Sequence, residues 1–127
     1  MIEHLTLPVR DYKKSKAFYV AILKPLGYKV RYEYGKACGF MEGGHTSIWI
    51  AEQPVRQKLH VAFRARGKKA VHDFYDAALK AGAKDNGAPG PRPDYSKDYY
   101  AAYVFDPDGH NIEAVCFVQP SRAKRRT

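Results

Sequence analysis

Three residues that lie far apart in the sequence could together bind a metal ion: His4, His60 and Glu113. Two neutral imidazole groups and one carboxylate form a ligand set that suits Fe(II), Mn(II), Ni(II) or Zn(II). Three protein ligands leave coordination positions open for water and for a substrate. Taken singly, each histidine is better explained by a place at a strand end, and the glutamate by a place on the surface. A shared site is favoured by where the three residues fall in an internal repeat.

The two halves of the chain are similar to each other. Residues 4–28 match residues 60–84 without a gap at a shift of 56 positions, with eight identities, and the two candidate histidines take the same position in this match. A second match, at a shift of 65 positions, relates the ends of the halves and places Ile48 opposite Glu113. Such a repeat indicates two copies of one structural unit. The expected units are a module over residues 1–56, a module over 57–119 and a basic tail over 120–127.

Each module is predicted to contain a strand, a helix and three further strands. Asp11 is an N-cap residue type before the first helix, and Pro25 and Gly27 are typical of its end. The segment 106–109, Asp-Pro-Asp-Gly, predicts a turn between the last two strands. The expected helices are residues 11–23 and 69–80, and the expected strands are 2–8, 28–34, 37–41, 46–51, 58–64, 84–87, 99–105 and 111–117. A Gly/Pro-rich loop is expected over 87–98. This order predicts an α+β fold whose two βαβββ modules form a curved cup with the helices outside.

Strand alternation indicates which side chains face this cup. The apolar side chains at alternate positions are expected to face the helices, so His4, His60 and Glu113 share the opposite face. Candidates for contacts with a small-molecule substrate are Arg64, Trp49, Tyr100, Tyr103 and Arg92. Tyr99 is a further candidate, and alternation separates Tyr99 and Tyr103 from Tyr100, so not all three tyrosines can line the cup.

Two further histidines follow glycines in turns. His45 and His110 occupy equivalent positions in the second match between the halves. We expect both to be exposed to solvent rather than catalytic.

The length and the cysteines favour one intracellular domain. A chain of 127 residues fits a single domain. No apolar run approaches the roughly 20 residues needed to cross a membrane, and the first residues lack the pattern of a signal peptide. Cys38 and Cys116 are too few for a disulfide framework and are expected to be buried thiols. A cytoplasmic protein with no membrane partner is therefore expected.

The chain carries a strong excess of positive charge. Lys and Arg number 22 against 13 Asp and Glu, which gives a net charge of +9. The positive residues are spread along the sequence except in the tail, and neither a zinc-finger spacing nor an RNA-binding motif accompanies them. Nucleic acid is therefore not the expected partner, and the charge favours attraction of anionic small molecules.

Several segments carry a resemblance to a known family. They are residues 4–11 (HLTLPVRD), followed by Ser15, Phe18, Tyr19, Leu23 and Gly27, then 60–63 (HVAF) and 106–113 (DPDGHNIE). With these segments the chain resembles the vicinal oxygen chelate superfamily, which includes glyoxalase I, extradiol dioxygenases, fosfomycin-resistance enzymes and bleomycin-binding proteins. The resemblance implies that His4, His60 and Glu113 occupy three of four metal-ligand positions, and that Glu113 is also the candidate catalytic residue. The fourth position falls on Ile48, or on Trp49 if one residue is inserted. Neither side chain can bind a metal, which argues against glyoxalase I.

The resemblance implies two alternative functions. The first is an enzyme that uses one divalent ion (Fe, Mn, Ni or Zn) to chelate a small oxygen-rich substrate, as a lyase, an isomerase or a ring-cleavage dioxygenase. The second is a metal-free protein of the bleomycin-resistance type that sequesters a small molecule. Family members of this size are usually homodimers, in which His4 of one subunit can join His60 and Glu113 of the other. The sequence is equally compatible with a site closed within one chain.

Overall fold

The computed structural model describes residues 1–118 and has two four-stranded sheets, each with one helix. The first module contains β1 (Leu5–Val9), α1 (Tyr12–Leu23), the 3-10 turn η1 (Lys24–Leu26), β2 (Lys29–Tyr34), β3 (Ala37–Glu42) and β4 (His45–Glu52). The second contains β5 (His60–Arg64), α2 (Lys68–Lys80), β6 (Lys84–Pro91), β7 (Tyr99–Phe105) and β8 (Asn111–Phe117). The sheet orders, β1-β4-β3-β2 and β5-β8-β7-β6, are the same in both modules. The predicted α+β fold of two βαβββ modules is therefore confirmed.

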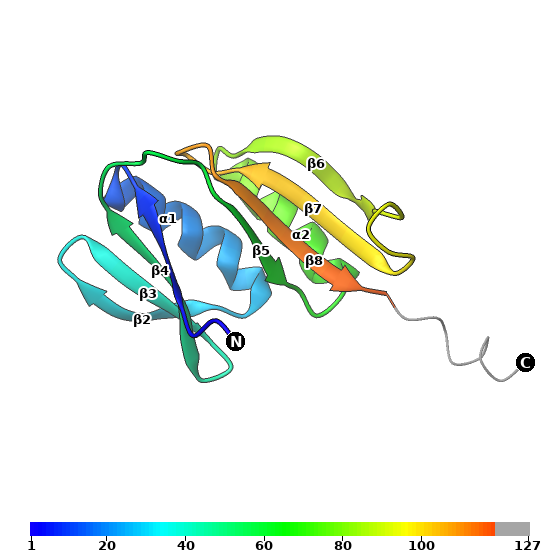
Figure 1. Ribbon diagram of the computed structural model, residues 1–127, viewed down its shortest axis with the longest axis horizontal. Coiled ribbons are helices and arrows are strands. Elements are labelled where there is room, and N and C mark those ends of the chain that lie inside the picture. Colours follow the sequence, from blue (N-terminus) through cyan, green and yellow to red (C-terminus); the bar gives the residue numbers. More distant parts are fainter. Residues whose placement is uncertain (119–127) are drawn as a thin grey trace, which may run out of the picture.

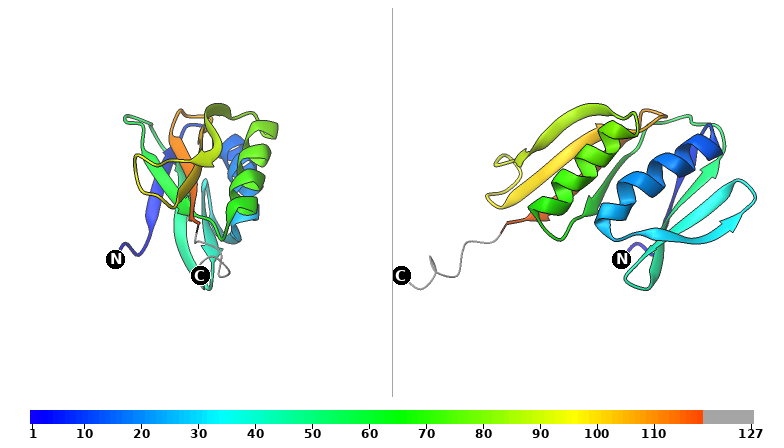
Figure 2. Two further views of the ribbon diagram at one scale, coloured as in Figure 1. Left: turned by 90° about the vertical axis from the view of Figure 1, so that its right-hand side faces the viewer. Right: turned by 180° about the vertical axis from the view of Figure 1, so that it is seen from behind.

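The two sheets lie side by side, and their uncovered faces are on the same side of the molecule (Figure 1). Both helices cover the back of the sheets, and they contact each other across the junction of the modules (Figure 2). The core lies between the helices and the sheets and includes Phe18, Ile22, Phe74 and Ile112. The opposite faces of both sheets are covered by no other element of residues 1–118. We call these two surfaces the open faces.

The first helix begins and ends where its sequence predicts. The Asp11 side chain accepts a hydrogen bond from the Lys14 backbone N–H at 3.1 Å, which satisfies one of the free donors of the first turn. The chain then leaves η1 at Gly27, whose φ of 91° is readily adopted only by glycine. Phe18 is 3% exposed, as expected for the helix–sheet core.

The strand β6 is longer than its sequence predicts. The expected strand ended at residue 87 in a loop, whereas β6 continues to Pro91 and only residues 92–98 form the connection. Prolines are tolerated here because β6 is the edge of its sheet, where half of the backbone N–H groups have no partner strand. The pairing with β7 shifts register on both sides of Gly87, so the strand is irregular.

The 106–110 turn connects the two modules. The Asp106 carboxylate accepts hydrogen bonds from the Tyr19 hydroxyl and from the backbone N–H groups of Asp108 and His110. The Asp108 carboxylate in turn accepts from the Arg10 backbone N–H at 3.1 Å. Arg10, which follows β1, and Tyr19 of α1 are therefore hydrogen-bonded to a turn of the second module, about ninety positions away in sequence. The turn belongs to the segment 106–113, which resembles the vicinal oxygen chelate family. In the structure, its Asp106 and Asp108 side chains bind the two modules together.

His110 is fully buried, which corrects the prediction that it is exposed. Its Nδ1 accepts a hydrogen bond from the Leu59 N–H at 2.9 Å, and its Nε2 lies 2.9 Å from the Pro8 carbonyl. Because Nδ1 is the acceptor, the proton belongs on Nε2, which donates to Pro8. His45, in the corresponding turn of the first module, is exposed as expected. The two histidines therefore differ although the sequence repeat makes them equivalent: His110 bonds to Pro8 of the other module, whereas His45 bonds to Glu3 of its own module.

The cysteines and the helices agree with what the sequence predicts of them. Cys38 and Cys116 are free and buried. Neither helix within residues 1–118 is long and apolar enough to cross a membrane. The expected basic tail, 120–127, lies outside the described residues.

Candidate metal centre

His60 and Glu113 meet on the open face of the second sheet. His60 begins β5, and Glu113 lies on the neighbouring strand β8, directly opposite Ala62. The His60 Nε2 and Glu113 Oε1 atoms are 2.8 Å apart. The Glu113 side chain is only 2% exposed, whereas that of His60 is 53% exposed. The carboxylate thus lies at the bottom of the site and the imidazole at its edge.

Two tyrosines of β7 surround the buried carboxylate. The Tyr99 hydroxyl donates to the second oxygen of Glu113. Tyr103 pairs with Glu113 across the sheet, and its ring centre is 6.3 Å from that of His60. Burial and the nearby Glu113 charge raise the pKa of Tyr103 to about 12 and also raise the pKa of Tyr99. Both phenols therefore remain protonated near neutral pH and can act as hydrogen-bond donors.

This pair fits part of a metal site. An imidazole nitrogen and a carboxylate oxygen on neighbouring strands are common ligands of divalent transition metals. In the described part of the chain, Glu113 forms an ion pair with His60 only, so no lysine or arginine neutralises it. Within residues 1–118, however, no three His, Cys, Asp or Glu side chains lie close enough to bind one ion. One chain therefore brings together two of the three candidate ligands.

His4 does not reach Glu113 in the same chain. It precedes β1 at the edge of the first sheet, and its Nδ1 lies 2.6 Å from Glu3 Oε1. Its side chain is 53% exposed, the same value as that of His60. The separation arises because the two open faces lie beside each other instead of facing each other (Figure 1).

Trp49 is the structural counterpart of Glu113. Trp49 pairs with Thr6 in the first sheet, as Glu113 pairs with Ala62 in the second. Ile48 pairs instead with Leu5 and is 3% exposed in the core. Of the two positions left open by the sequence, the structure therefore selects Trp49, which requires one inserted residue in the alignment of the halves.

An aromatic cluster surrounds Trp49 on the open face of the first sheet. Its ring centre is 6.1 Å from those of Tyr32 and Tyr34, with interplanar angles of 3° and 15°. A Cβ atom on Gly39 would lie 2.7 Å from the indole ring, so Gly39 makes room for the indole on the sheet. We call Tyr32, Tyr34 and Trp49 the aromatic cluster.

Arg92 lies beside the His60–Glu113 pair. Together with His60 and Tyr103 it lines an open pocket of about 410 Å³. Its guanidinium is 5.3 Å from the centre of the Tyr103 ring, and its Nη2 donates to the Ala88 carbonyl at 2.7 Å. Tyr95 also lines this pocket, and sequence reasoning missed it because it lies in a connection without periodicity.

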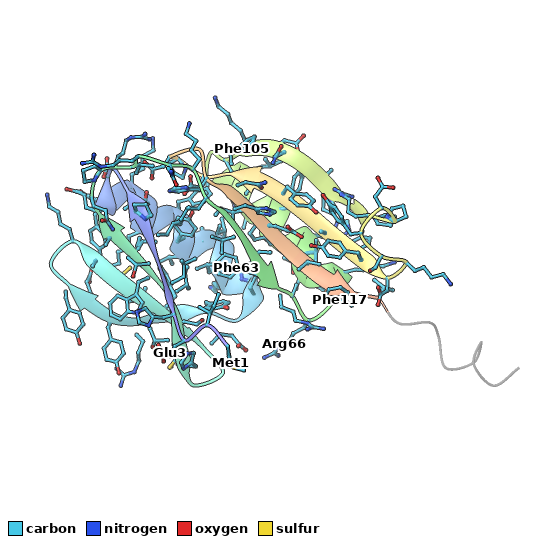
Figure 3. All side chains as sticks on the ribbon, viewed as in Figure 1. Met1, Glu3, Phe63, Arg66, Phe105 and Phe117 are labelled. Carbon is cyan, nitrogen blue, oxygen red and sulfur yellow. The ribbon has the colours of Figure 1, made fainter. Side chains whose placement is uncertain are left out.

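Arg64 and Tyr100, two predicted substrate contacts, do not line the pocket at His60. Arg64 is four residues beyond His60 on β5, where its guanidinium is 4.9 Å from the centre of the Phe117 ring. It lines a different hollow, of about 350 Å³, near the labelled Phe117 in Figure 3. Tyr100 points to the helix side of β7, where its hydroxyl is 2.7 Å from His72 Nε2. Neither side chain contributes to the pocket at His60.

Comparisons of the sequence and of the structure with known proteins point to the same family. The family model for the glyoxalase/bleomycin resistance protein/dioxygenase superfamily matches residues 1–114. A glyoxalase/bleomycin resistance protein from Albidiferax ferrireducens has a similar structure, with 26% identity, a TM-score of 0.79 and coverage of 90% of this chain and 97% of that chain. No curated protein matches the sequence.

Two fosfomycin resistance proteins share the fold. A variant of FosX from Listeria monocytogenes, solved with Mn(II) and 1S,2S-dihydroxypropylphosphonic acid, has 24% identity and a TM-score of 0.70, with coverage of 100% of this chain and 98% of that chain. FosX from Mesorhizobium loti has 18% identity and a TM-score of 0.69 at the same coverage. At these identities the likeness concerns the fold alone.

Proposed function

Because the chain belongs to the glyoxalase/bleomycin resistance protein/dioxygenase superfamily, we propose that it is a divalent-metal-dependent enzyme acting on a small oxygen-rich substrate. The observation that carries this proposal is the His60–Glu113 pair, whose ligand atoms are 2.8 Å apart on an open face. A buried carboxylate without a lysine or arginine partner is costly unless a cation or strong hydrogen bonds compensate its charge. A metal ion bound between the two side chains would provide that compensation.

The third ligand in this proposal is His4 of a second copy of the chain. His4 precedes β1 as His60 begins β5, so the two histidines have equivalent places on their open faces. A two-fold related copy could cover one open face with the other and bring His4 to the pair. The exposure of large aromatic side chains on these faces, among them Tyr34 and Phe117, supports such a cover.

The side chains around the pair suit the chemistry of chelation. A bound divalent ion would polarise two adjacent substrate oxygens and stabilise negative charge that develops on them. Tyr99 holds Glu113 in place through its hydrogen bond. The Tyr103 side chain lines the pocket, and its buried hydroxyl has no hydrogen-bond partner among residues 1–118, so a small movement of the side chain would let it donate to a substrate oxygen. Arg92 adds a positive charge at the pocket for an anionic substrate group.

Titration with Mn(II) and a mass measurement test the proposal. In isothermal titration of chelator-treated protein, we expect saturation near one ion per chain. Light scattering should give twice the chain mass of 14.4 kDa. Fewer than about 0.2 ions per chain with Mn, Fe, Ni and Zn alike would contradict the metal-dependent function, because this ligand set suits all four ions.

A metal-free binding protein is the second candidate function. The aromatic cluster favours it, because stacked rings on an open face can hold a flat apolar ligand without a metal. Trp49 is the single tryptophan of the chain, so its fluorescence reports on this face. Quenching by a planar ligand at equal affinity with and without Mn(II), in protein that binds no metal, would support this alternative.

Trp49→Glu is expected to tighten Mn(II) binding. Position 49 is the counterpart of Glu113, so in the proposed dimer it lies near the ion and a carboxylate there supplies a fourth ligand. We expect about a tenfold lower dissociation constant, or about 1.4 kcal/mol. The matched control is Tyr34→Glu, which adds the same charge to the same aromatic cluster. Equal tightening in both variants would indicate long-range attraction and would argue against a ligand at position 49.

A further inference from the structure

A third hollow lies at the junction of the modules and is strongly basic. It has a volume of about 680 Å³ and is lined by Arg10 and Lys14 from the first module and by Lys58 and Lys84 from the second. It lies at the end of the molecule where β7 turns into β8, near the labelled Phe105 in Figure 3. None of its lining residues lines the pocket at His60.

The lysines of this hollow have no acidic partners. Lys16, Lys36 and Lys69 form ion pairs elsewhere on the surface. Within residues 1–118, by contrast, Lys14, Lys58 and Lys84 form none. Exposed like charges without partners repel one another and attract anions.

The acidic residues of the hollow do not neutralise these lysines. Asp106 and Asp108 are each only 5% exposed. The Asp106 carboxylate accepts hydrogen bonds from the Tyr19 hydroxyl and from backbone N–H groups, and Asp108 is bonded to Arg10. Both carboxylates are thus directed into the protein, and the accessible charge of the hollow is positive.

Gly109 opens space for one of the lysines. A Cβ atom at this position would lie 3.0 Å from Lys58 Nζ and 3.1 Å from its Cδ and Cε atoms. The Lys58 side chain therefore extends closely over the turn that borders the hollow. The positive charges, which are spread along the sequence, thus converge on one concave surface built by both modules.

We propose that this junction hollow binds a small anion that carries two or more linked phosphate groups. Lysine binds phosphate oxygens as a compact charge with three donors. Three lysine charges are more than the negative charge of one phosphate group can neutralise. The volume of about 680 Å³ is in the range of small-molecule sites, roughly 300–1,000 Å³, and concavity favours a small molecule over a flat polymer contact. Phe105 and Pro107 give the hollow an apolar wall for the rest of such a molecule.

Calorimetric titration with inorganic pyrophosphate tests the site. At a fixed ionic strength of about 0.15 M, where the screening length is about 8 Å, we expect one saturable site per chain. Inorganic phosphate and sulfate should bind at least about tenfold more weakly, because each satisfies fewer of the lysines. Binding that is absent up to about 10 mM, or equal for all three anions, would overturn the proposal.

Paired variants locate the binding. Lys14→Gln, Lys58→Gln and Lys84→Gln combined should weaken pyrophosphate binding at least about tenfold. The matched control is Lys29→Gln, Lys80→Gln and Lys97→Gln, which removes the same charge from other exposed positions and should leave affinity within about twofold. Equal loss in both variants would mean non-specific attraction.

Two further controls distinguish the junction hollow from the metal centre and from a loss of folding. Pyrophosphate also binds metal ions, so the titration is repeated with Glu113→Gln, which should bind pyrophosphate as the wild type does. Loss of binding in that variant would place the anion at the metal centre and contradict the junction site. The single variants Lys58→Gln and Lys84→Gln, with thermal unfolding of each, keep the test valid if the triple variant does not fold.

Discussion

Glu113→Gln is expected to weaken Mn(II) binding by at least about a hundredfold while the fold is retained. The substitution keeps the shape of the side chain and its hydrogen bond with Tyr99, but removes the single anionic ligand of the proposed site. Loss of groups that only support metal ligands already lowers affinity about 10–100-fold, and a lost ligand should cost more. Calorimetric titration with Mn(II) measures the change.

The control for this variant is Glu33→Gln. Glu33 contacts Tyr12 and Lys16 of α1, so it lies on the helix side of its sheet and away from both open faces. Its substitution removes the same charge and should leave Mn(II) affinity within about twofold. Unchanged binding in Glu113→Gln would exclude Glu113 as a ligand and with it the proposed centre.

Mixing two variants that each bind Mn(II) poorly tests whether the site is shared between chains. His4→Ala and Glu113→Gln should each bind Mn(II) poorly when alone. After both are unfolded, mixed in equal amounts and refolded, half of the dimers contain one chain of each kind, and one of their two sites is intact. We therefore expect recovery of about one quarter of the wild-type binding capacity. No recovery in dimers of mixed composition would place all ligands within one chain.

His110→Ala is expected to lower the free energy of unfolding by about 3–5 kcal/mol. His110 is fully buried and bonds to Leu59 and Pro8, so its loss leaves a buried N–H and a buried carbonyl without partners and creates a cavity. Urea unfolding at one fixed chain concentration measures the change, since the stability of a dimer depends on concentration.

The internal repeat supplies the control for this variant. His45 occupies the equivalent turn of the first module, and its side chain is 51% exposed. His45→Ala should cost less than about 1 kcal/mol, because an exposed hydrogen bond can be replaced by water. Equal losses in the two variants would mean that the bonds of His110 across the junction contribute nothing specific.

Much of the fold follows from local sequence signals. Asp11 and Gly27 define the ends of α1, alternation defines most strands, and the Asp106–Gly109 turn separates β7 from β8. Alternation also places His60 and Glu113 on one face, where the structure brings them together. These features depend on neighbours in sequence or on one sheet, which a periodic pattern can reveal.

The features that sequence reasoning missed depend on contacts between modules or on strand pairing. His110 is buried because its turn meets β1 of the other module, which no local pattern records. The choice between Ile48 and Trp49 required the register of β1 with β4. The relation of His4 to Glu113 required the relative orientation of the two sheets, which depends on how α1 and α2 pack together.

The common orientation of the two open faces has a genetic consequence. In the proposed dimer, each centre takes His4 from one subunit and His60 with Glu113 from the other. A chain carrying both His4→Ala and Glu113→Gln therefore removes one ligand from each of the two centres of any dimer that contains it. Co-expressed with the wild type, such an allele should be dominant negative, since each defective chain also silences the normal chain it pairs with.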